Sequence, residues 1–276
     1  MLETVTGRAR KYKQPRGGYI KPSEMEMIKR EDSIELKDEN ISASIVGTVV
    51  DYMTRFMDGD TLEEAFKISL LGADRINEKE KANELLKKVH GLDEDSIISA
   101  CKLVGFDTAF RAGPMTYKPV EDINPDKDTI NNIIVMIKRC LSFIEDYGPI
   151  VDNGMTFIGG YTPTVVSGDA DFMTEDTIWD LKVTKNPIKP AHTLQILMYY
   201  IMGCRAIKLN AEHNFKNKIK KIGIYNPRKN EVYILEISKI SVETVKEVET
   251  DVIGYKEGVI DPHLKVMFDK IKKKKA

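Results

Sequence analysis

Three aspartates and a lysine interrupt a stretch that otherwise has the alternating pattern of a β-hairpin. Asp169 and Asp171 lie in TVVSGDADFM, and Asp180 and Lys182 lie in TIWDLKV. If residues 175–176 form the turn, Asp171 lies opposite Asp180, and like charges that face each other destabilise a sheet. Because side chains alternate along a strand, Asp180 and Lys182 share a face with Asp169 as a neighbour. A register shifted by one residue separates them.

Facing carboxylates of this kind suit a divalent cation. Asp171, Asp180 and the backbone carbonyl of Leu181 offer hard oxygen ligands for Mg²⁺, which keeps waters and accepts phosphate oxygens. A lysine such as Lys182 orients a metal-bound water or stabilises charge on a phosphate. The pattern therefore predicts Mg²⁺-dependent phosphodiester hydrolysis, with Mn²⁺ as a substitute metal. The alternative is a surface hairpin with a simple Asp180–Lys182 ion pair, which an isolated D-x-K usually is.

A helix predicted over residues 190–204 follows the hairpin. His192, Gln195 and Tyr199 recur at a spacing that places them on one helix face, and the leucines between them can face the core. Taken alone, such a face is typical of the polar edge of a core. Beside the hairpin, it favours a functional site.

Three short segments together resemble the PD-(D/E)XK nuclease superfamily: GDADF (168–172), WDLK (179–182) and QILMY (195–199). They are most similar to the RecB-like branch, which includes the CRISPR adaptation nucleases and is related to the phage lambda-type exonucleases. In that branch, successive strands carry G-x-x-D and D/E-x-K, and the following helix carries Q-x-x-x-Y. All three motifs occur here in that order.

The resemblance implies roles for five residues. Asp171 and Asp180 would hold the metal, Lys182 would be the catalytic lysine, and Gln195 and Tyr199 would contact DNA or support the lysine. It also implies an α/β fold with a mixed central sheet flanked by helices and an α-helical insertion. The implied activity is an exonuclease-like deoxyribonuclease of phage or bacterial DNA recombination, repair or defence. A homo-oligomer and a helicase or recombinase partner are compatible with it.

The branch also carries an upstream G-x-x-x-H helix whose histidine is a metal ligand. The matching position is GTVVD, from Gly47 to Asp51, where aspartate replaces the histidine. Aspartate can ligate Mg²⁺, so Asp51 is the predicted further ligand, with Asp169 and Glu145 as alternatives. An exposed helix residue is the other interpretation of Asp51.

Three other function classes stay open at this stage. The substitution at Asp51 favours a catalytically inactive nucleic-acid- or protein-binding module on the same fold. A restriction-type endonuclease or an RNA-cleaving effector would use the same motifs. A plain structural α/β protein would need the charges of the hairpin to be exposed to solvent.

Hydrophobic periodicity predicts the elements that must position these residues. Residues 1–40 are predicted to be a basic extended arm, residues 41–260 a single nuclease domain with a helical insertion at about 60–147, and residues 261–276 a basic tail. The predicted helices cover 42–57, 61–89 with a break near Gly72, 93–104, 126–148, 190–204 and 241–252, and the predicted strands cover 149–158, 164–173, 177–184, 220–227 and 231–237.

Bulk properties exclude several classes of protein. Among 276 residues, 42 Lys and Arg nearly balance 43 Asp and Glu, so net charge does not select a partner. The three cysteines lack metal-ligand or disulfide spacing, which favours a reducing cytoplasm. No segment approaches the ~20 apolar residues of a membrane helix. The basic arm and the lysines between 208 and 229 are solvated charge or, with the nuclease interpretation, contacts to DNA phosphates.

Overall fold

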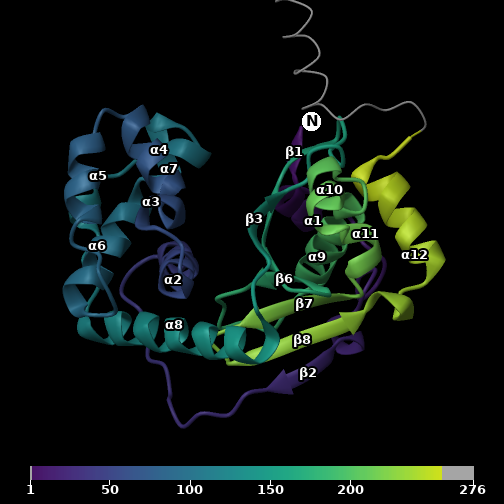
Figure 1. Cartoon of the computed structure of the whole chain (residues 1–276), viewed down its shortest axis with the longest axis horizontal. Helices are drawn as coiled ribbons and strands as arrows, with labels where there is room; N and C mark the ends of the chain where they lie inside the picture. Colours follow the sequence, from purple (N-terminus) through teal and green to yellow (C-terminus); the bar gives the residue numbers. More distant parts are fainter. Residues whose placement is uncertain (1, 257–276) are drawn as a thin grey trace, which may run out of the picture.

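The structure is a computed structural model that describes residues 2–256 (Figure 1). It shows a mixed α/β protein with a six-stranded mixed sheet, a small parallel sheet and about a dozen helices. The predicted mixed sheet flanked by helices is therefore confirmed. The predicted tail over residues 261–276, like the end of the predicted nuclease domain, lies outside the described residues.

The central sheet has the strand order β2-β8-β7-β6-β5-β3, and β6 and β7 are its parallel pair. Parallel neighbours need a crossover connection, which here contains the helix α9 (Pro190–Gly203). A separate two-stranded sheet pairs β1 with β4. The strands are β1 (Glu3–Thr4), β2 (Glu26–Lys29), β3 (Asp152–Thr156), β4 (Val165–Ser167), β5 (Asp169–Met173), β6 (Thr177–Leu181), β7 (Lys221–Asn226) and β8 (Glu231–Glu236).

The β5–β6 hairpin has the predicted register. Phe172 pairs with Trp179, and Met173 pairs with Ile178. The residues that flank positions 175–176 are joined by a 2.9 Å backbone hydrogen bond, so the turn has the two predicted residues. Continuing this register by one pair places the two aspartates of the motif opposite each other.

The helices between residues 43 and 111 form a separate block beside the sheet, on the left of Figure 1, and α8 (Lys127–Tyr147) runs beneath both parts. Polar side chains accept backbone N–H groups at the predicted helix starts Ser42, Thr61, Asp93 and Asp126. The helices are α2 (Ala43–Asp58), α3 (Leu62–Ala65), α4 (Lys67–Arg75), α5 (Lys79–Leu86), α6 (Glu94–Gly105), α7 (Asp107–Arg111) and α8 (Lys127–Tyr147).

Shorter helices cover the other side of the sheet. They include α1 (Val5–Lys11), α10 (Ile207–His213), α11 (Phe215–Lys218) and α12 (Val242–Glu247), which continues as a π-helical turn over Val248–Ile253. Short 3₁₀ turns occupy Pro22–Glu24, Pro114–Thr116, Val120–Asp122 and Ile237–Lys239. Among residues 2–256, no helix is both long and apolar enough to span a bilayer.

Two predicted details of the helices and strands are wrong. Gly72 lies inside α4 and does not break it; the chain breaks at Phe66 and again at residues 76–78. A Cβ at Gly72 would lie 2.0 Å from the carbonyl oxygen of Phe106, so this glycine permits close packing. The predicted strand 164–173 is divided at Gly168, which has φ +154° and packs against Val5.

The prediction of an extended N-terminal arm is wrong where the chain forms the helix α1 and the strand β2. Val5 and Ala9 on α1 are buried, as are Ile20 and Met25. The strand β2 pairs with β8 and completes the edge of the sheet. The many basic residues of this segment suggested an exposed arm, but its few apolar residues pack in the core.

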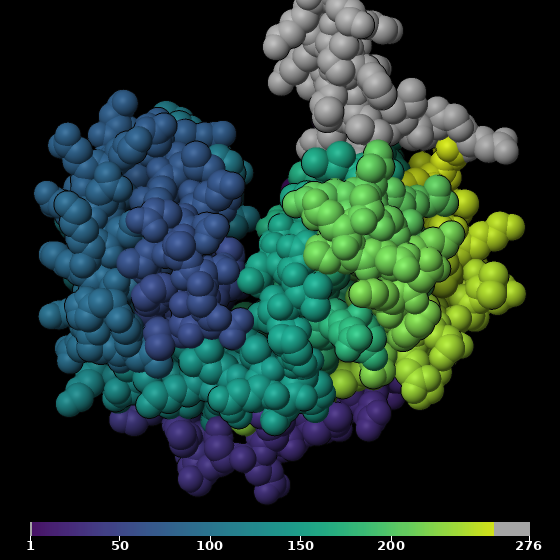
Figure 2. All heavy atoms as spheres, viewed as in Figure 1, coloured from purple at the N-terminus to yellow at the C-terminus, as the bar shows by residue number. Residues whose placement is uncertain are grey.

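The two sides of the sheet carry two apolar clusters. One lies between the sheet and α9, and the other joins the opposite face to α8 and the helical block. At the second, the Phe143 ring of α8 lies 4.9 Å from the Trp179 ring and 4.2 Å from the Tyr225 ring, between centroids. These contacts hold α8 to the sheet. Figure 2 shows a deep hollow between the helical block and the sheet side of the molecule.

Candidate functional site

The predicted site residues line one cleft, which has a volume of about 640 Å³. It lies between α2, the β5–β6 hairpin and α9. Asp169 and Gly47 line it as well. The structure therefore brings together three segments that are far apart in the sequence. The predicted residues that line the cleft are Asp51, Asp171, Asp180, Leu181, Lys182, Gln195 and Tyr199.

Asp171 and Asp180 form the acidic centre of the cleft. The backbone N–H of Leu181 donates a 2.5 Å hydrogen bond to Asp171 Oδ2, which fixes that carboxylate at the end of the hairpin. Burial raises the pKa of Asp171 well above its usual range, and the charges of Asp180 and Asp51 raise it further. Burial also raises the pKa of Asp180, while Lys182 opposes the shift. The site therefore holds negative charge at an electrostatic cost.

Lys182 lies directly beside Asp180. Its Nζ is 2.6 Å from Asp180 Oδ2, and the two side chains are 20% and 2% exposed. No other described residue donates a hydrogen bond to this Oδ2. Lys182 is therefore its partner among residues 2–256. This contact leaves a buried carboxylate oxygen with capacity for a further ligand.

Gln195 and Tyr199 complete the support of Asp180 from α9. Gln195 Nε2 donates to Asp180 Oδ1 at 3.2 Å and to the Tyr199 hydroxyl at 2.8 Å. Burial raises the pKa of Tyr199 well above its usual range, and the charges of Asp180 and Asp171 add to the shift. Gln195 and Tyr199 of the Q-x-x-x-Y motif therefore hold the Asp180 carboxylate of β6 in place.

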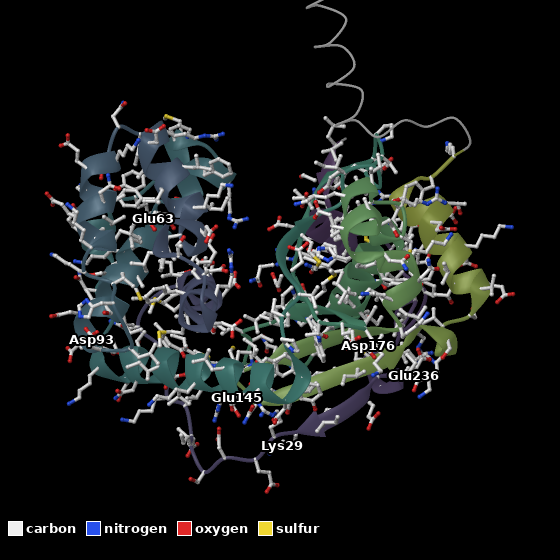
Figure 3. The ribbon with its side chains drawn as sticks, in the orientation of Figure 1. Lys29, Glu63, Asp93, Glu145, Asp176 and Glu236 are labelled. Atoms are coloured by element: carbon white, nitrogen blue, oxygen red, sulfur yellow. The ribbon has the colours of Figure 1, made fainter. Side chains whose placement is uncertain are left out.

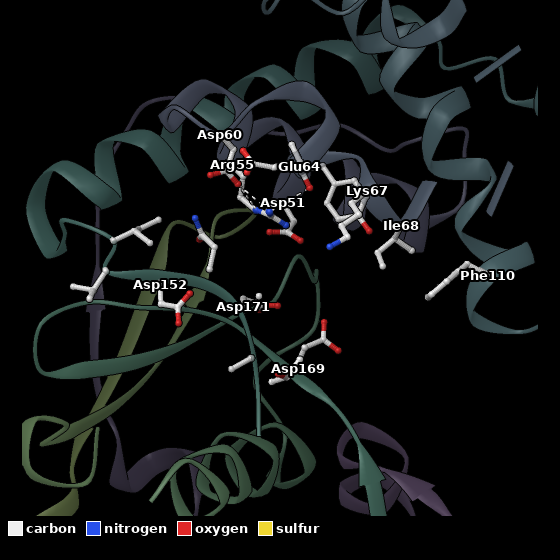
Figure 4. A pocket seen from close by; sticks show the side chains of 18 of the residues that line it. Asp51, Arg55, Asp60, Glu64, Lys67, Ile68, Phe110, Asp152, Asp169 and Asp171 are labelled. Atoms are coloured by element: carbon white, nitrogen blue, oxygen red, sulfur yellow. Dashed lines mark hydrogen bonds and ion pairs between the residues drawn. The ribbon is translucent and has the colours of Figure 1, made fainter. Parts of the chain in front are cut away.

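Asp51 reaches the same cleft from α2. Its burial raises the pKa of its carboxyl to about 6, with an opposing effect from Arg55 and a further increase from Asp169. Figure 4 shows Asp51 and Asp171 on facing sides of the hollow, with Asp169 beside Asp171. Asp51 is thus not the exposed helix residue that was the alternative interpretation.

Two of these carboxylates, with water and substrate as the other ligands, suit Mg²⁺ better than a site made of protein side chains alone. Within residues 2–256, no three Asp, Glu, His or Cys side chains are close enough to form a metal-binding group. Mg²⁺ is commonly held by one or two carboxylates, with waters and substrate phosphates as its other ligands. Asp171 and Asp180 meet that requirement, since burial raises the pKa of both carboxyls and Asp180 Oδ2 has Lys182 as its one partner among residues 2–256.

Several residues singled out in the sequence lie elsewhere. Glu145 is exposed on α8 and does not line the cleft (Figure 3). His192 accepts the Lys189 N–H through Nδ1 at 3.2 Å and is not among the lining residues. The lysines between 208 and 229 do not line it either, and Lys221 pairs with Asp176 at 2.9 Å.

The helical block contributes residues that sequence motifs did not indicate. A second hollow of about 700 Å³ shares Asp51, Asp169, Asp171 and Arg111 with the first and extends along α2 and α4. We call the first hollow the carboxylate limb and the second the helical limb of one cleft. Arg55, Lys67 and Arg111 supply its cations, and only the packing of α2, α4 and α7 places them there.

Comparisons with known protein families, with curated proteins and with solved structures find no match to this chain.

Proposed function

We propose that the protein is a Mg²⁺-dependent deoxyribonuclease of the PD-(D/E)XK type, on a RecB-like version of that fold. One arrangement carries the proposal. Asp171 and Asp180 lie next to the paired residues Phe172 and Trp179 of the hairpin, and the charge of Asp180 acts on Asp171. Lys182 lies 2.6 Å from Asp180, and Gln195 donates to the other oxygen of Asp180. Three motifs of the resembled family thus meet in a single cleft.

The residues of the cleft would have different roles in phosphodiester hydrolysis. Asp171 and Asp180 would hold Mg²⁺, with Asp51 beside them, and the bound ion would activate water and offset charge on the phosphate. The Leu181 N–H and Gln195 hold the two carboxylates in place.

Lys182 has a separate task in this scheme. Its ammonium group is partly exposed at the cleft, so it can donate to a substrate phosphate oxygen and stabilise the charge that develops there. The proposal of an exonuclease-like enzyme of phage or bacterial recombination, repair or defence rests on the family resemblance. So do a homo-oligomer and a helicase or recombinase partner.

The test is cleavage of end-labelled linear duplex, closed circular duplex and single-stranded DNA in Mg²⁺, Mn²⁺ or EDTA. We expect metal-dependent degradation of linear substrates that disappears in Asp180→Asn. The matched control is Asp176→Asn, which alters a carboxylate of the same hairpin outside the cleft. Cleavage of circular duplex would favour the restriction-type endonuclease. Full activity of Asp180→Asn would contradict the mechanism.

A non-catalytic DNA-binding module on the same fold is the second candidate. It is favoured by one observation, that Asp51 stands where the resembled family has a metal-ligating histidine. DNA binding with no cleavage in any of these metals would support this candidate over the first.

A further inference from the structure

A buried carboxylate anchors one residue of the helical block at the mouth of the cleft. Asp107 is 6% exposed and accepts hydrogen bonds from the Tyr52 hydroxyl at 2.7 Å and from Ser69 Oγ at 2.6 Å. Arg111 contacts the same group, with Nε 3.5 Å from Asp107 Oδ2 and Nη2 3.3 Å from the Tyr52 hydroxyl. Burying a carboxylate is costly unless it is hydrogen-bonded. The contacts of Asp107 offset that cost, and they hold one edge of the Arg111 guanidinium in place.

The other side of Arg111 faces the cleft. Its side chain is 51% exposed and lines both the carboxylate limb and the helical limb. Within residues 2–256, its ion pair is with Asp107 and not with Asp51, Asp169 or Asp171. A guanidinium has five N–H donors in a rigid fork. The buried network uses one edge of that fork and leaves the rest directed at the cleft.

Lys67 is a second cation on the same wall. It is exposed at the start of α4 and lines the helical limb, and Figure 4 shows its ammonium group directed into the hollow. Arg55 in the same limb is paired with Asp60 at 2.9 Å. Lys67 forms no ion pair with any residue from 2 to 256, and its charge acts on Glu64 of the same limb. Carboxylates such as Glu64 and Asp169 also line this limb, but among residues 2–256 neither Arg111 nor Lys67 forms an ion pair with them.

We propose that Arg111, at the junction of the two limbs, and Lys67, in the helical limb, bind phosphates of the nucleic-acid strand. The proposal rests on the proposed nuclease function, because it assigns the phosphate to the strand whose cleavage occurs at Asp171 and Asp180. A strand that enters the carboxylate limb and continues along the helical limb passes Arg111. Arginine binds phosphate oxygens in a bidentate manner. Tyr52 and Asp107 are positioning residues for it.

The test measures binding of a fluorescein-labelled oligonucleotide by fluorescence anisotropy in EDTA, so that cleavage does not interfere. For Arg111→Ala we expect affinity to fall about tenfold, the effect of losing one charge-assisted hydrogen-bonding group. The slope of log K against log salt should decrease by about 0.7 to 0.9, the value for one phosphate contact. Arg111→Lys should keep the slope and recover only part of the affinity.

The matched control is Arg205→Ala. Arg205 is 47% exposed and has one acidic partner, Glu249 at 3.3 Å, but lies outside both limbs. Arg205→Ala should change neither the affinity for the oligonucleotide nor the slope of log K against log salt. Lys67→Ala provides a second variant that removes an exposed side chain without disturbing the buried network. Oligonucleotides with and without a 5′-phosphate identify whether the bound phosphate is terminal or internal.

The outcomes separate this inference from the proposed function. Unchanged affinity and slope in both Arg111→Ala and Lys67→Ala, with metal-dependent cleavage by the unmodified protein, would overturn the phosphate site alone. Reduced slope in these variants, with no cleavage by the unmodified protein in any metal, would support the phosphate site and contradict the nuclease.

Discussion

The cleft carboxylates should destabilise the folded protein in the absence of metal, and Asp51→Asn tests this. Burial raises the pKa of Asp51 from 3.8 to about 6. Each pKa unit corresponds to 1.36 kcal/mol, so the ionised carboxylate costs up to about 3 kcal/mol of folding free energy. Asparagine has the same shape and carries no charge. We therefore expect Asp51→Asn to be more stable than the unmodified protein at neutral pH.

The pH dependence gives this prediction its sign. Between the unfolded and folded pKa values, the folded state binds more protons than the unfolded state, so stability falls as pH rises. The advantage of Asp51→Asn should therefore be near zero below about pH 4, grow between about pH 4 and pH 6, and stay constant above. Urea unfolding in EDTA across this range measures it.

A matched control and a clear refutation are available. Glu145→Gln removes an exposed carboxylate outside the cleft and should change stability little. An unchanged or lower stability of Asp51→Asn at neutral pH would refute the reasoning, as would a gain that persists in acid. If the gain occurs together with lost cleavage, the carboxylate serves function at the expense of stability.

Three further predictions follow from the same contacts. Mg²⁺ at a hundred times its dissociation constant should stabilise the protein by about 2.7 kcal/mol in thermal unfolding, and Asp180→Asn should lose this effect. Gln195→Leu should lower the cleavage rate at saturating DNA about tenfold, because Asp180 Oδ1 loses its amide donor. An unchanged rate would show that this hydrogen bond from α9 does not support catalysis. Gly72→Ala should cost about 1 to 3 kcal/mol in urea unfolding through overpacking against Phe106, and a neutral effect would show that α4 can shift.

Local patterns were sufficient to predict the hairpin and the helix starts. A two-residue turn between alternating apolar residues determines the register that pairs Phe172 with Trp179. Side-chain caps such as Asp93 and Asp126 mark where helices begin, because they satisfy backbone N–H groups that lack helical partners. These signals lie within a few residues of the feature they specify.

Features that depend on distant contacts were not predictable in this way. The need for glycine at position 72 comes from the carbonyl of Phe106. The N-terminal segment is part of the core because β2 pairs with β8. Arg111 enters the cleft only through a network that joins it to Tyr52 and Asp107, and no short motif encodes that packing.

The central claim is that this cleft cleaves DNA through its carboxylates and Lys182. The most direct measurement is the single-turnover cleavage rate of Lys182→Ala at saturating DNA in Mg²⁺, with binding measured on the same samples. Lys185→Ala is the control, since Lys185 is a nearby exposed lysine outside the cleft that pairs with Asp38. We predict that Lys182→Ala binds DNA and stays folded but loses cleavage, while Lys185→Ala cleaves normally. Equal cleavage rates for the two variants would contradict the account.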